Sequence, residues 1–257
     1  MSVQEKLRNI LTGVETEMKG KKYVAITGFS GVGKTVLLTL LNHALDSSFF
    51  DRYPDIKGHV ASGRPILETW ENSLLDGEFP KRTQLSTRED IVIEMSGKGL
   101  TSATRHIHLP DISGEDFKTM CIEDIDDEER LLQVLEMAKI KGKPHGVMSY
   151  VPLSNMYLIL LDCSKISEWE KLAIRHVQFL TTIRAFKNII NQTPSSDKIN
   201  TPIGIILTKS DNLPDPDVTA SEIVHTHMKR FSNALESIHT NPEKIKFFKV
   251  YIDVERD

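Results

Sequence analysis

One segment near the start of the chain has the residue types and spacing that bind a nucleoside triphosphate. The run from Gly28 to Thr35, GFSGVGKT, fits the P-loop pattern G-x-x-x-x-G-K-[ST] at every fixed position. Its glycines allow backbone N–H groups to face an anion, and a following helix would direct its positive end at the same anion. We expect Lys34 to hold the β- and γ-phosphates and the Thr35 hydroxyl to ligate Mg²⁺. The predicted phosphate-binding residues are Gly28, Ser30, Gly31, Val32, Gly33, Lys34, Thr35 and Val36.

A D-x-x-G motif, Asp111 to Gly114, follows the predicted strand 105–109. A carboxylate at the end of a strand can hold Mg²⁺, so Asp111 is a candidate metal ligand. Gly114 can bring its N–H to the γ-phosphate and change its backbone conformation when that phosphate leaves. The motif is short, and by itself it fits a surface turn equally well.

A third motif, Thr208-Lys209-Ser-Asp211, follows the apolar strand predicted over 203–207. The Asp211 carboxylate can accept hydrogen bonds from the N1–H and N2–H₂ groups of guanine, and adenine offers no such pair of donors. The apolar stem of Lys209 can lie over the face of the base. Thr208, Lys209 and Asp211 are therefore candidate base-binding residues.

The three motifs occur in a fixed order, each at the carboxyl end of a predicted strand, where open α/β sheets bind ligands. Over residues 22–250 this order resembles the P-loop GTPase superclass, which implies a Mg²⁺-dependent GTPase that binds GTP and GDP and acts as a switch. The segments Asp111–Phe117 and Phe79–Thr83 further resemble the prokaryotic double-GTPase families of bacterial conflict systems. That narrower resemblance implies a protein partner encoded nearby, and a second GTPase is one candidate.

The same resemblance assigns roles in hydrolysis. Thr83, favoured over Thr87, is the expected switch I threonine and a Mg²⁺ ligand. Glu115 stands where many small GTPases carry the glutamine that positions water, so with Lys34, Thr83 and Gly114 it completes the predicted catalytic set. A carboxylate beside the γ-phosphate adds like-charge repulsion, and we expect slow turnover without a partner. The Ser-Ala pair that usually closes the base site is missing from residues 247–257.

Strands alternate with helices along most of the chain, which predicts an α/β fold with a doubly wound, mainly parallel sheet and helical inserts, as in a P-loop G domain. An amphipathic helix within residues 1–20 would precede a GTPase domain over 21–257, packing either on that domain or on a partner. An insert at about 117–155 is the first candidate for a partner or self-association surface. The predicted strands are 23–27, 91–95, 105–109, 157–161, 203–207 and 245–250, the predicted helices 3–19, 36–45, 66–75, 126–138, 168–190 and 220–237, and residues 47–64 are expected to be irregular.

Composition limits the remaining possibilities. The 257 residues carry a net charge of −4, so no nucleic-acid-binding surface is expected. Cys121 and Cys163 are predicted to be free thiols in a reducing compartment. No signal peptide or transmembrane segment is evident, which favours the cytoplasm. The alternatives left open are a nucleotide-binding scaffold with negligible hydrolysis, a P-loop ATPase and a P-loop kinase.

Overall fold

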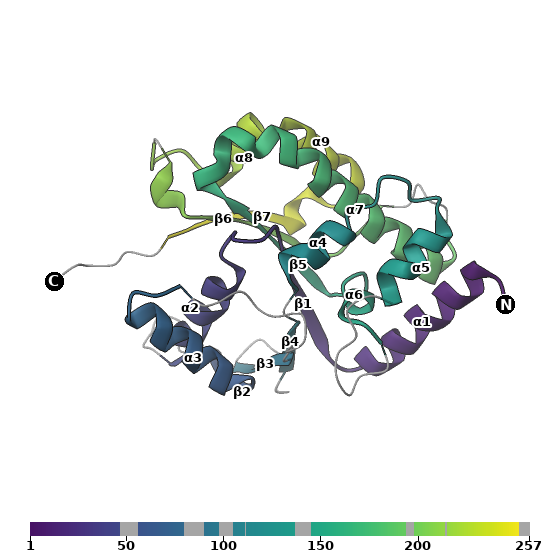
Figure 1. Cartoon of the computed structure of the whole chain (residues 1–257), viewed down its shortest axis with the longest axis horizontal. Helices are drawn as coiled ribbons and strands as arrows, with labels where there is room; N and C mark the ends of the chain where they lie inside the picture. The colour runs from purple at the N-terminus through teal and green to yellow at the C-terminus, as the bar shows by residue number, and fades with distance from the viewer. Residues whose placement is uncertain are drawn as a thin grey trace.

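The computed structural model describes residues 1–46, 56–79, 90–97, 105–110, 112–136, 145–193, 198–213 and 215–251. In these ranges seven strands form one sheet in the order β2-β3-β4-β1-β5-β6-β7 (Figure 1). Strands β4, β1, β5, β6 and β7 pair in parallel, each with the next in this order. The pairs β2–β3 and β3–β4 are antiparallel. The predicted α/β fold with a mainly parallel sheet is confirmed. The strands are β1 Lys22–Thr27, β2 Ile56–Ser62, β3 Asp90–Gly97, β4 Arg105–Pro110, β5 Met156–Asp162, β6 Ile203–Thr208 and β7 Ile245–Val250.

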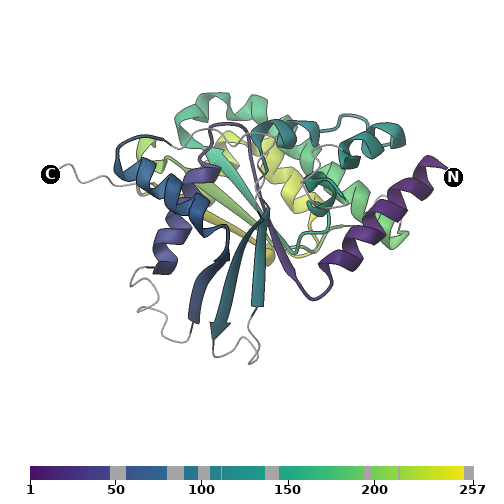
Figure 2. The same cartoon turned by 60° about the horizontal axis from the view of Figure 1, so that its bottom comes forward.

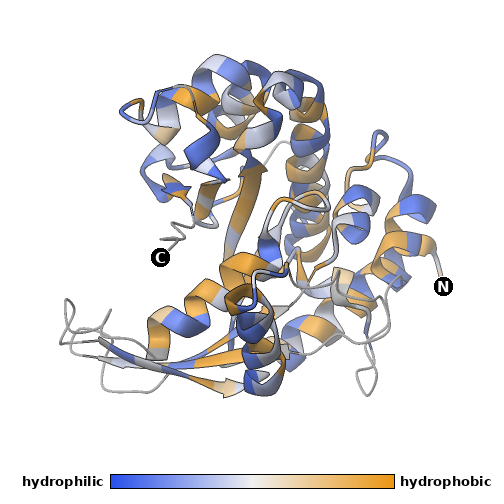
Figure 3. Cartoon of the chain, turned by 60° about the vertical axis from the view of Figure 1, so that its left-hand side comes forward, coloured by the Kyte–Doolittle hydropathy of each residue, from blue (hydrophilic) through white to orange (hydrophobic). Residues whose placement is uncertain are grey.

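Helices cover both faces of this sheet. Along β5 the side chains alternate, because Ile159 and Leu161 join one apolar core while Leu160 joins the other. The core around Leu160 is closed by α2 and α3, and the core around Ile159 by α1, α4, α5, α7, α8 and α9. Figure 3 shows apolar residues along the strands and both apolar and hydrophilic residues along the helices. The helices are α1 Val3–Met18, α2 Lys34–Asp46, α3 Arg64–Leu75, α4 Gly114–Thr119, α5 Glu128–Glu136, α6 Val147–Tyr150, α7 Trp169–Asn191, α8 Ala220–His227 and α9 Lys229–Ile238, with the short 3₁₀ helices η2 Cys163–Glu168, η3 Ser210–Asn212 and η4 Pro242–Lys244.

The predicted N-terminal amphipathic helix is present as α1, and its apolar face packs on the rest of the chain. Leu7, Leu11 and Val14 are fully buried. Ser2 caps the helix, its hydroxyl accepting a hydrogen bond from the Glu5 N–H. Figure 2 shows α1 beside the helices of the 117–155 segment, and α1 contacts α5, α6 and α7. The apolar face of α1 therefore packs against other helices of the same chain.

Two local predictions are wrong. Residues 47–64 were expected to be irregular, yet β2 occupies Ile56–Ser62 and pairs with β3. Val60 is the one buried side chain described in β2, so the sequence there lacks the alternation that marks a strand. The single helix predicted over 220–237 is two helices, because Met228 has non-helical angles (φ −133°, ψ 48°) while apolar residues keep helical spacing on both sides.

Both cysteines are free thiols, as predicted, and both are buried. Within the described residues, no helix has the length and apolar character needed to cross a membrane.

Replacing Leu11 by alanine should lower the free energy of unfolding by about 2–5 kcal/mol, because it opens a cavity in a fully buried helix–helix contact. Urea denaturation followed by circular dichroism measures this. Glu15→Ala, on the exposed side of the same helix, is the matched control and should change stability by less than about 0.5 kcal/mol. Equal effects of the two substitutions would contradict the packing described for α1.

Candidate functional site

The P-loop connects β1 to α2 and has the backbone conformation that its glycines allow. Gly28, Gly31 and Gly33 have φ angles of +146°, +81° and +93°, a region that residues with a Cβ rarely adopt. The Lys34 Nζ donates hydrogen bonds to the Gly28 carbonyl (2.8 Å) and the Phe29 carbonyl (3.0 Å). The lysine thus lies across its own loop, where phosphate oxygens can take over as acceptors.

The end of β6 holds this loop in place. The Thr208 hydroxyl donates a hydrogen bond to the Val32 carbonyl at 2.7 Å and lies 3.2 Å from the Leu161 carbonyl. A Cβ on Gly28 would come within 2.9 Å of the Leu160 carbonyl oxygen, so the loop also runs directly against β5. The first residue of the predicted base motif is therefore bonded to the predicted phosphate loop.

The glycine of the D-x-x-G motif contacts the P-loop directly. A Cβ on Gly114 would lie 2.1 Å from the Ser30 nitrogen and 2.5 Å from the Ser30 Cα. Gly114 begins α4, which is fixed by a capping box between Ser113 and Asp116. Glycine is required here because the two backbones approach so closely, a reason additional to the conformational freedom expected from the motif.

Glu115 points away from this contact. Its carboxylate pairs with Lys118 on the next turn of α4 at 3.0 Å, and its side chain is 63% exposed. In this conformation the residue predicted to influence the attacking water is held by a neighbouring lysine.

Lys209 in the base motif has a left-handed backbone (φ +54°) and an anchored side chain. Its Nζ lies 2.6 Å from the Asp162 Oδ2, and the Asp162 side chain is only 3% exposed. The other carboxylate oxygen, Oδ1, accepts hydrogen bonds from the Ser164 N–H (3.0 Å) and hydroxyl (2.6 Å). Burial raises the pKa of Asp162, but the hydrogen bonds from Lys209 and Ser164 outweigh it, and the pKa falls below the ordinary 3.8. Asp162 therefore stays ionised and fixes the lysine stem.

Asp211 lies in the short helix η3 and is exposed, with one carboxylate oxygen 3.0 Å from the Asn212 side-chain nitrogen.

Burial and the nearby carboxylates of Asp162 and Asp211 raise the pKa of the Cys163 thiol to about 12. A thiol with so high a pKa carries almost no thiolate at neutral pH, so Cys163 is not suited to act as a nucleophile.

The structure brings the P-loop, Gly114 and the segment Thr208–Asp211 together at the carboxyl edge of the sheet. Thr35 and Val36 are half-buried in the first turn of α2, beside the loop. The predicted Mg²⁺ ligands Thr83 and Asp111, together with Thr87, lie outside the described residues.

Sequence reasoning missed two residues of this edge. Asp162 was overlooked although it ends β5 beside two motif-bearing strands, the same positional signal that identified the motifs. Phe29 was treated as a variable P-loop position. Its ring packs edge-on against Phe117 of α4 and His176 of α7, with centroid distances of 5.0 and 5.3 Å.

Residues 25–139 match the family model Double-GTPase 1. This part of the chain is therefore similar to the double GTPases. The match covers a little under half of the chain and includes the P-loop and Gly114, while Thr208–Asp211 lie beyond it.

Solved structures with some likeness are GTP-binding proteins of low identity. One is the Roco2 RocCORdC of Methanosarcina barkeri bound to GDP (TM-score 0.34, 12% identity, 90% of this chain and 43% of that one). Another is the Ski7 GTPase-like domain of S. cerevisiae with GDP and inorganic phosphate (TM-score 0.43, 14%, 93% and 45%). A third is the signal recognition particle receptor complex SRb-GTP/SRX of Chaetomium thermophilum (TM-score 0.37, 15%, 92% and 92%). The chain spans less than half the length of the first two, and no curated protein matches it.

Replacing Asp162 by asparagine should destabilise the protein by about 1–3 kcal/mol at neutral pH, because a buried carboxylate with three hydrogen bonds is lost. A carboxyl whose pKa is lowered in the folded state contributes stability above its unfolded pKa. That contribution disappears as the pH falls below about 3.8 and through the folded value. The difference in urea midpoint between wild type and variant should therefore be constant from pH 5 to 8 and shrink below pH 4. A difference independent of pH would show that the charge of Asp162 contributes nothing.

Proposed function

We propose that this protein binds GTP and GDP with Mg²⁺, hydrolyses GTP to GDP and phosphate, and acts as a nucleotide-dependent switch. The observation that carries the proposal is the convergence of three motifs on one edge of the sheet. Lys34 lies across the P-loop, Gly114 touches the loop at Ser30, and Thr208 is bonded to it at Val32. These are the parts that phosphate binding, phosphate sensing and base reading require.

The choice of guanine rests on Asp211 and its supports. Lys209 is held by the buried Asp162, so the stem of the lysine has a fixed surface to offer a base. Asp211 follows two residues later with an exposed carboxylate that can accept two donors from the guanine edge. An ATPase is disfavoured because adenine presents no such pair of donors to a carboxylate.

Mg²⁺ suits the residues proposed to hold it. Thr35 supplies a hydroxyl oxygen at the start of α2, and Thr83 and Asp111 would add two more oxygen ligands, the donor type that Mg²⁺ prefers. The metal would supply charge neutralisation for the phosphates. Lys34 and the P-loop N–H groups would hold the same phosphates. To do so, Lys34 would exchange the Gly28 and Phe29 carbonyls for phosphate oxygens.

Replacing Asp211 by asparagine should weaken GDP binding at least 10-fold and improve xanthosine diphosphate binding, because an amide N–H can pair with the xanthine O2 where guanine carries an amino group. Titration with fluorescent GDP, xanthosine and adenosine diphosphates plus Mg²⁺ measures this. Asp215→Asn, an exposed carboxylate in the next loop, is the control. ADP binding as tight as GDP binding to wild type would exclude the guanine proposal.

The hydrolysis step depends on how α4 meets the P-loop. Gly114 contributes the close approach, and Glu115 lies one residue further into the helix. Because Glu115 is paired with Lys118, it must change partner before it can act near a γ-phosphate. This supports slow intrinsic turnover that a partner would accelerate, and the 117–155 insert remains our proposed surface for that partner. The same Glu115–Lys118 pair would also suit the alternative function, a nucleotide-binding scaffold with negligible hydrolysis.

Replacing Gly114 by alanine should leave GDP affinity within about 3-fold and reduce multiple-turnover phosphate release at least 10-fold. The added methyl would meet the Ser30 backbone, so α4 must shift away from the γ-phosphate position. A phosphate-release assay with GTP and Mg²⁺ provides the measurement, with GDP affinity of the same variant as internal control. Wild-type protein that binds GTP but releases no phosphate above background would favour the scaffold.

A further inference from the structure

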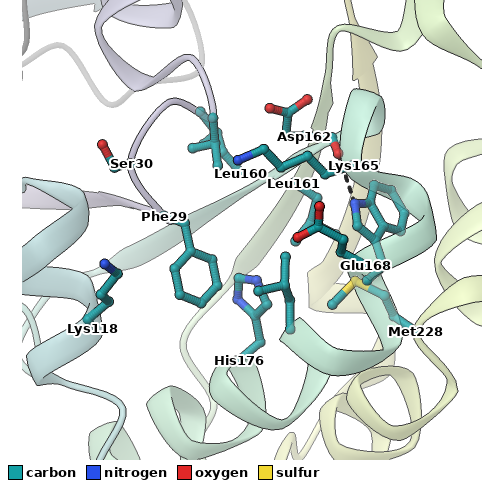
Figure 4. Close-up of a pocket in the computed structure, with 13 residues that line it drawn as sticks. Phe29, Ser30, Lys118, Leu160, Leu161, Asp162, Lys165, Glu168, His176 and Met228 are labelled. Carbon is teal, nitrogen blue, oxygen red and sulfur yellow. Dashed lines mark hydrogen bonds between the residues drawn. The ribbon is translucent and has the colours of Figure 1, made fainter.

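A small cavity lies on the outer side of the P-loop, between the loop, the end of β5 and α7 (Figure 4). Its volume is about 200 Å³. The walls are mostly apolar, formed by Phe29, Val32, Leu160, Leu172 and Met228. Ser30 and Val32 of the predicted phosphate-binding loop line it, whereas Lys34, Thr35, Lys209 and Asp211 do not, so the cavity adjoins the proposed nucleotide site without including its lysines or its base-reading carboxylate.

His176 of α7 lies at the bottom of this cavity, beside the Phe29 ring (Figure 4). Its side chain is 1% exposed, and its Nδ1 has no hydrogen-bond partner among the described residues. Burial lowers the pKa of His176 to about 3, so the imidazole is neutral and carries one donor and one acceptor nitrogen. A buried polar atom without a partner destabilises the folded state, and a ligand that supplies one binds more tightly as a result.

Charged side chains lie at the mouth of the cavity. Lys165 of η2 is exposed and forms no ion pair within the described residues, and Figure 4 shows its side chain running across the upper edge of the cavity. Lys118 is also at the mouth, already paired with Glu115, and Glu168 lies below Lys165. Of the two lysines that line the cavity, Lys165 is therefore the one without a described ion pair, and the Asp162 carboxylate, which also lines it, is paired with Lys209.

We propose that this cavity is a second binding site, for a small aromatic acid with a single ring and a polar group opposite its carboxylate. A cavity of about 150 Å³ accommodates benzene, so about 200 Å³ suits one substituted ring. The ring would pack among the apolar walls, a hydroxyl would pair with His176 as donor or acceptor, and the carboxylate would face Lys165.

Phe29 makes this site relevant to the P-loop, because one side of its ring faces the cavity and its backbone carbonyl accepts from Lys34. If the proposed function holds, GDP and the aromatic acid would alter each other's affinity by the same factor.

The test is titration of the full-length, nucleotide-free protein with 4-hydroxyphenylacetate, by calorimetry or ligand-observed NMR. We expect a dissociation constant of about 1 mM or lower. Two analogues test the two polar contacts separately. 4-Methylphenylacetate lacks the hydroxyl that would pair with His176, and 4-hydroxyphenethyl alcohol lacks the carboxylate that would face Lys165. Each should bind about 3- to 10-fold more weakly than the parent acid.

Variants assign these losses to residues. His176→Phe keeps an aromatic ring and should bind 4-hydroxyphenylacetate and 4-methylphenylacetate equally. Lys165→Gln should lose the preference for the carboxylate, while Lys171→Gln, an exposed lysine on α7 outside the cavity, should behave as wild type.

The proposal is overturned if 4-hydroxyphenylacetate does not bind at 10 mM, or if both site variants bind it as wild type does. Should His176→Phe fail to fold, Lys165→Gln and the ligand series still decide the matter. Because no nucleotide is present, failure here leaves the GTP proposal untouched, and loss of GDP binding does not affect this result.

Discussion

The Thr208 hydroxyl lies within hydrogen-bond distance of the Val32 and Leu161 carbonyls, and this contact joins three parallel strands at their carboxyl ends. The P-loop follows β1, Leu161 belongs to β5, and Thr208 ends β6. The register that pairs Leu161 with Leu207 brings the hydroxyl between the two carbonyls. One side chain therefore ties the P-loop to the ends of β5 and β6, since a buried hydroxyl needs a partner.

Close approach of backbones is the second constraint at this edge. Gly28 passes within van der Waals contact of β5, and Gly114 passes still closer to Ser30. Any side chain at either position would separate elements that the site needs together. The glycines of the two motifs thus serve the same purpose, although only those of the P-loop have positive φ angles.

The sequence predicted the sheet, the order of the motifs and the edge on which they meet, because buried parallel strands read as apolar runs and P-loop residues have a fixed spacing. It did not predict β2, whose side chains are mostly exposed and whose formation depends on pairing with β3. Nor did it reveal the break at Met228, where the apolar period continues through a local change of backbone angles. Asp162 escaped notice because its importance depends on Lys209, which is distant in sequence.

Phe29 links the nucleotide edge to the interior in a way that spacing alone does not show. Its ring contacts Phe117 and His176, and those rings continue to Phe179 and Phe231. Gly114 and Phe117 both belong to the short helix α4. Movement of α4 away from the P-loop would therefore have to break their contacts with Ser30 and Phe29 together. Packed aromatic rings have few alternative arrangements, so any shift of α4 would be between discrete positions. A P-loop with a small residue at position 29 would lack this constraint, and its α4 would be free to move without disturbing α7.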